Sequence, residues 1–118
     1  MAAQNPTADP RVVPIDLPPA QGEILRDDLL GWLAGIEIDL RTPDRLRDPE
    51  ATIRDADAFR RLLAALDRGE IELPDEVARG ALEGAARGYD QASDYRRIAA
   101  VHDAHRALLK ILDAGERP

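Results

Sequence analysis

The chain contains two histidines, His102 and His105, which lie three positions apart in a segment with helical apolar periodicity. Both imidazoles therefore lie on one side of a predicted helix, about one turn apart. Such a pair can bind a metal ion or transfer a proton. Helical zinc and di-iron sites need further ligands, such as a glutamate three residues before a histidine, but Ala99 holds that position before His102. A metal would have to recruit Glu37 or Asp39 from the first predicted helix, so we expect no metal and no other cofactor.

Arg97 precedes His102 with four residues between them. This Arg-x4-His spacing resembles the degenerate motif of the HEPN ribonucleases, which are small all-helical proteins that usually work as dimers. The resemblance covers these two residues and the helical size class. The family usually has a polar residue after the arginine, where this chain has Ile98, although Arg96 offers a second register. The resemblance implies that Arg97 and His102 would position and protonate RNA phosphates across a dimer interface without a metal.

Composition and charge limit the classes of function. The 118 residues suffice for one domain with one core. The formal charge is −7, and neither a basic stripe nor a set of stacking aromatics is present, so nucleic acid is disfavoured as a partner. The absence of cysteine excludes disulfides and thiolate chemistry. No apolar run approaches the roughly 20 residues that span a bilayer, and the first residues lack a signal-peptide core. We expect a soluble, cytoplasmic protein without a membrane partner.

Terminal signals and apolar periodicity predict the elements that hold these residues. Five prolines in the first 19 residues indicate a flexible arm at residues 1–11, followed by a single helical domain at 12–116. Helices are expected from about Pro19 to Leu40, from Pro49 to Arg68, from about Asp75 into the segment GYDQASD, and from about Asp94 to Asp113. The last two could instead form one long kinked helix.

Four residues provide the expected helix ends. Asp48 is a typical N-cap for the second helix, and Gly69 has the C′ position at which a positive φ favours glycine. Ser93 can cap the last helix, and Gly115 should end it.

The first helix has two apolar sides. The opposite side to its core stripe carries Ile24, Gly31, Gly35 and Ile38. Another helix, the N-terminal arm or a second subunit could cover that side. The expected core stripe consists of Leu25, Leu29, Trp32, Leu33, Ile36 and Leu40.

The third helix carries a glycine at every fourth position, namely Gly80, Gly84 and Gly88. Each glycine inside a helix costs about 1 kcal/mol relative to alanine, so a compensating use is expected. Close contact with a neighbouring helix or subunit is one interpretation, and a tolerated, locally soft helix is the other.

An internal repeat relates the two halves of the chain. The segments DAFRRLLAALDRGE (57–70) and DAHRALLKILDAGE (103–116) align without gaps and share nine of fourteen residues. The extended leads IDLPP (15–19) and IELPD (71–75) also correspond. In this alignment His105 matches Phe59 and His102 matches Ala56, so packing is the expected role of both histidines. The repeat predicts two related helical hairpins that share one core.

The sequence therefore predicts an all-α, four-helix bundle built from two related hairpins, preceded by a short extended arm. Its expected role is that of a non-catalytic interaction or regulatory module, most simply a homodimer, that binds itself or another protein. The predicted contact surface comprises Ile24, Gly31, Gly35, Ile38, Gly80, Gly84 and Gly88. The alternative is a HEPN-like, metal-independent ribonuclease that uses Arg97 and His102.

Overall fold

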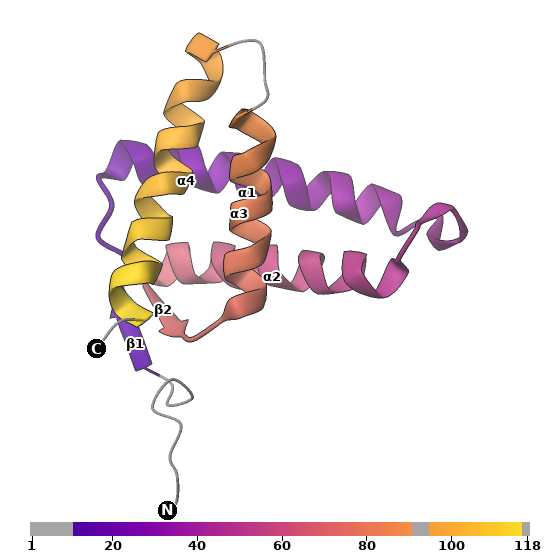
Figure 1. Cartoon of the computed structure of the whole chain (residues 1–118), viewed down its shortest axis with the longest axis horizontal. Coiled ribbons are helices and arrows are strands. Elements are labelled where there is room, and N and C mark those ends of the chain that lie inside the picture. The colour runs from indigo at the N-terminus through magenta and orange to yellow at the C-terminus, as the bar shows by residue number, and fades with distance from the viewer. Residues whose placement is uncertain (1–10, 91–94, 117–118) are drawn as a thin grey trace, which may run out of the picture.

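A computed structural model describes residues 11–90 and 95–116, and within these ranges the chain is mostly helical, with four α-helices and a two-stranded sheet (Figure 1). The first half contains β1 (Arg11–Pro14), α1 (Pro19–Asp39), a 3-10 turn (Pro43–Arg45) and α2 (Pro49–Arg68). The second half contains β2 (Glu70–Leu73), α3 (Glu76–Asp90) and α4 (Tyr95–Glu116). The predicted helical fold is thus confirmed at the level of its elements.

The helices form two hairpins that lie across each other (Figure 1). Helix α1 packs beside α2, and α3 packs beside α4, so the last two helices are not one long kinked helix. Between the hairpins, α1 contacts α4 and α2 contacts α3. Leucines of all four helices meet where the hairpins cross, and the fully buried ones are Leu25, Leu29, Leu62, Leu82, Leu108 and Leu112. The core therefore lies between the two hairpins.

Strand β2, which includes the start of the second lead, pairs with β1, which lies directly before the first lead; the sequence did not predict this pairing. Strands β1 and β2 are antiparallel, with Val13 opposite Ile71. The side chains of Ile71 and Leu73 are buried, whereas the alternate residues of β2 are exposed. Arg11 is the first residue of β1, so the predicted arm is wrong at its last residue; residues 1–10 lie outside the described part of the chain.

Capping explains where α2 and α3 begin and where α2 ends. As predicted, Asp48 accepts the N–H of Ala51 at 3.1 Å, and Gly69 ends α2 with a φ of 79°. Asp75 accepts the N–H of Ala78 at 3.0 Å and two hydrogen bonds from Arg61 of α2, at 2.9 and 3.0 Å. Partial burial raises the pKa of Asp75, but these hydrogen bonds outweigh burial and lower it. The start of α3 is thereby attached to α2, while the predicted cap Ser93 lies outside the described residues.

The buried sides of α1, α3 and α4 do not simply contain the largest apolar residues of each helix. Trp32 of α1 is 38% exposed, although it was expected in the core stripe. In α3 the larger side chain of Val77 is exposed, whereas that of its neighbour Ala78 is buried. In α4 the small residue Ala104 is buried. The reason is that crossing helices approach most closely at small side chains, whereas a helical wheel centres the buried arc on the largest ones.

The end of α4 also differs from the prediction. Gly115 does not terminate the helix, which continues to Glu116. A Cβ added to Gly115 would lie 2.7 Å from Leu73 Cδ1 and 2.8 Å from Val13 Cγ2. Gly115 therefore allows α4 to pack against the sheet. Gly69, at the matching position of the repeat, serves instead as a positive-φ helix end.

We expect Gly115→Ala to lower the free energy of unfolding by about 1 to 3 kcal/mol, because the added methyl overpacks the contact between α4 and the sheet. Gly35→Ala is the matched control, since a Cβ there meets nothing within 4 Å. That control should be neutral or should stabilise the protein by up to about 1 kcal/mol. Urea denaturation of both variants measures the difference, and equal effects would contradict the close contact.

Candidate functional site

His105 is a buried packing residue at the crossing of α4 and α1. It is completely buried, and its Nε2 lies 2.9 Å from Oδ2 of Asp28 in α1. The repeat predicts that His105 packs in the place of a phenylalanine, and its complete burial is compatible with that role. Asp28 itself is mostly buried, with a side chain that is 16% exposed.

Burial lowers the pKa of His105 to about 4, and the like charge of His102 adds to this effect. The carboxylate of Asp28 acts in the opposite direction, because a nearby negative charge favours the protonated ring. The net result is a neutral imidazole at neutral pH. Such a ring can donate one N–H to Asp28 and has no free face for a substrate.

His102 lies one turn away and is half-buried. Its Nε2 has no contact with solvent. The side chain of Arg97 lies outside the described residues, although its backbone belongs to α4. The Arg97–His102 pair of the ribonuclease alternative therefore stays a prediction.

No group of three or more metal-binding side chains occurs within residues 11–90 and 95–116. Glu37, one of the two acids that a metal site would need, contacts Arg60 of α2 at 3.3 Å. The other, Asp39, lines a separate groove on α1. Within the described residues, neither acid forms a metal-binding group with the histidines.

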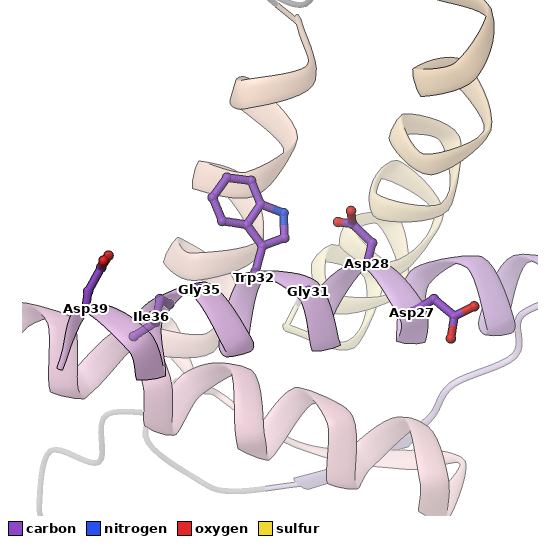
Figure 2. Close-up of a pocket in the computed structure, with 7 residues that line it drawn as sticks. All are labelled: Asp27, Asp28, Gly31, Trp32, Gly35, Ile36 and Asp39. Atoms are coloured by element: carbon purple, nitrogen blue, oxygen red, sulfur yellow. The ribbon is translucent and has the colours of Figure 1, made fainter. Parts of the chain in front are cut away.

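This groove lies along α1 and has a volume of about 450 Å³. Figure 2 shows that Asp28, Trp32 and Asp39 leave α1 on one side, whereas Asp27 points away from them. A Cβ added to Gly31 or Gly35 would meet nothing within 4 Å, so the space beside both glycines is unfilled. The lining residues are Asp27, Asp28, Gly31, Trp32, Gly35, Ile36 and Asp39.

Apolar side chains are exposed along the same helix. Leu30 is 40% exposed, Trp32 38% and Ile38 58%. Among the described residues six large apolar side chains are exposed, and these three on α1 are half of them. The others are Val12, Ile53 and Val77. Exposed apolar surface is thus concentrated on α1, which is typical of an interaction surface.

Only some residues of the predicted contact surface are exposed on the same face. Gly31, Gly35 and Ile38 are exposed on α1, but Ile24 packs against the core. Gly80 and Gly84 are exposed on α3, and an added Cβ at either meets nothing within 4 Å, so close contact with a helix of the same chain is wrong for these two. The surroundings of Gly88 lie outside the described residues.

Sequence reasoning missed the acidic character of the α1 groove. The signal was present, because residues 27–40 contain four acids and no lysine or arginine. A prediction based on the apolar residues alone does not include these acids.

A second depression, of about 570 Å³, lies beside α3 and the end of β2. Gly80 lines it together with Arg11 and Arg79. Arg79 forms ion pairs with Glu83 and Asp113, so its charge is already balanced within the chain. This depression offers no concentrated charge to a ligand.

Fold and site together define a mostly helical protein of four described helices, and half of its exposed large apolar residues within the described ranges lie on α1. No family model, curated protein or solved structure matches the chain. None of the described helices is long and apolar enough to span a membrane.

Proposed function

We propose that this protein is a non-catalytic interaction module that binds another protein chain through the uncovered face of α1. In this proposal the four helices form a four-helix bundle of two related hairpins, which holds α1 in place. The contacts of α1 with α4 and of α3 with α2 support the relation between the hairpins, since each first helix packs on the second helix of the other hairpin.

The observation that carries the proposal is the exposure of Leu30 and Ile38 beside the open glycines Gly31 and Gly35. Leaving large apolar side chains in water is unfavourable by about 25 cal/mol for each Å². A partner that covered α1 would recover this free energy. His105, by contrast, is completely buried and offers no exposed reactive group.

Self-association is the form of binding that the sequence predicts, and it can be measured directly. We expect light scattering to show association that strengthens with protein concentration. Ile38→Glu should weaken it by at least about tenfold, because a carboxylate would be buried in the contact.

Ile53→Glu is the matched control, since Ile53 is an exposed isoleucine of α2. The control should associate like the unmodified chain. Equal behaviour of the two variants would contradict a contact through α1, and a protein that stays monomeric up to about 1 mM would overturn the homodimer.

The ribonuclease alternative stays a separate prediction with its own test. It requires RNA cleavage without metal that is abolished by His102→Ala. An unmodified chain that leaves RNA intact in the presence of a chelator would contradict it.

A further inference from the structure

We infer that the uncovered face of α1 binds the same face of a second copy in antiparallel orientation, with Asp27 of each copy paired to Arg41 of the other. This inference rests on the proposed function and adds the partner and the pairing of residues. It concerns one strip of residues, the α1 strip, which consists of Asp27, Leu30, Ala34, Ile38 and Arg41.

The spacing of the α1 strip is that of a helix contact. Its members are three, four, four and three residues apart, which places them along one side of a helix. All five are exposed. Arg41 lies just beyond α1, but its N–H donates to the carbonyl of Ile38 at 3.1 Å, so the chain is still in a helical turn there. The strip is about 21 Å long at 1.5 Å per residue.

The strip is free of the rest of the molecule. Two neighbouring charged residues of α1 face α2 instead, since Arg26 pairs with Asp67 and Glu37 pairs with Arg60. Within the described residues, neither Asp27 nor Arg41 takes part in an ion pair. Two charged side chains of opposite sign, neither in an ion pair within the described residues, therefore lie at the two ends of an apolar strip.

Twofold symmetry makes this pattern complementary to itself. In an antiparallel pair whose axis passes at Ala34, each residue faces the one equally far on the other side of the axis. Leu30 then faces Ile38 of the second copy, and Asp27 faces Arg41 of the second copy. Ala34 is small, and Gly31 borders the strip with open space, so the two helix backbones can approach closely. A parallel pair would instead place like charges together at both ends.

Charge reversal provides the test, with light scattering at low ionic strength, where exposed ion pairs are least screened, as the measurement. Asp27→Arg leaves two cations and no acid at the strip ends, and Arg41→Asp leaves two acids and no cation. Each variant alone should self-associate at least about tenfold more weakly than the unmodified chain. An equimolar mixture of the two should associate like the unmodified chain, because every contact in the mixed dimer joins opposite charges.

The control mixture combines Asp55→Arg with Arg54→Asp, which make the same charge changes at exposed positions of α2. Each of these should associate like the unmodified chain. A mixture of the α1 variants that stays as weak as its components would overturn the antiparallel pairing. If Ile38→Glu still abolished association in that case, the proposed function would stand and only the pairing would be wrong. A monomeric unmodified chain would overturn the inference together with the homodimer.

Discussion

Replacing Phe59 by alanine is expected to lower the free energy of unfolding by about 3 to 5 kcal/mol. The ring of Phe59 is 4% exposed and stacks on Trp32, with ring centroids 6.5 Å apart and an interplanar angle of 6°. Its removal loses buried apolar area, leaves a cavity between α1 and α2, and ends an aromatic pair. A domain of this size is typically stable by only about 5 to 15 kcal/mol, so the loss is a large part of the total.

Urea denaturation measures this effect, and the chain supplies its own probe, since Trp32 is the only tryptophan. Its emission in the folded Phe59→Ala variant should shift to longer wavelength as water reaches the ring. Ile53→Ala is the matched control, because Ile53 belongs to the same helix and is 49% exposed. Ile53→Ala should lower the free energy of unfolding by less than about 1 kcal/mol. A Phe59→Ala variant as stable as this control would show that the stacked pair is absent in solution.

The second large effect is a loss of stability in acid that depends on His105. The pKa of His105 is about 4 in the folded chain and 6.5 without the fold. Between these values the unfolded chain binds a proton that the folded chain excludes. The contribution of the neutral ring to the free energy of unfolding is therefore fully present above pH 6.5, and it is lost as the pH falls to about 4. The difference corresponds to about 3 kcal/mol.

His105→Gln isolates this contribution, because glutamine keeps an N–H donor near Asp28 and does not titrate. Between pH 6.5 and 4 the unmodified chain should lose about 3 kcal/mol more unfolding free energy than this variant. The comparison cancels the titration of carboxylates elsewhere in the chain. Proton NMR of the His105 ring is an independent measurement, and titration of that ring near pH 6.5 would contradict the burial effect.

Local features of the fold were readable from the sequence because their causes act within a few residues. Asp48 and Gly69 are examples, since a cap bonds to backbone three residues away and a positive φ concerns one residue. Both ends of α2 follow from these signals. The repeat also indicated the character of His105, because its counterpart Phe59 is apolar.

Some residues of the candidate site could also be predicted from the sequence, and others could not. Gly31, Gly35 and Ile38 were expected on an accessible side of α1, and they are exposed. Ile24 was grouped with them because the helical wheel puts it on the same side, but it packs against the core. A wheel describes the whole length of a helix, whereas a crossing helix covers only a part of it.

The two glycines of the repeat show the limit most clearly. Gly69 and Gly115 occupy matching positions in nearly matching segments, yet Gly69 ends a helix and Gly115 packs inside one. The difference arises from the sheet, because Leu73 and Val13 are present next to Gly115 only after β1 and β2 have paired.

Helix content, the two ends of α2, the repeat and the apolar nature of the core are thus properties of the sequence, because short-range periodicity and capping are sufficient to produce them. The pairing of β1 with β2, the contact between His105 and Asp28 and the uncovered face of α1 arise only in the tertiary structure. These features join residues tens of positions apart, and the packing of the whole core determines which of them meet.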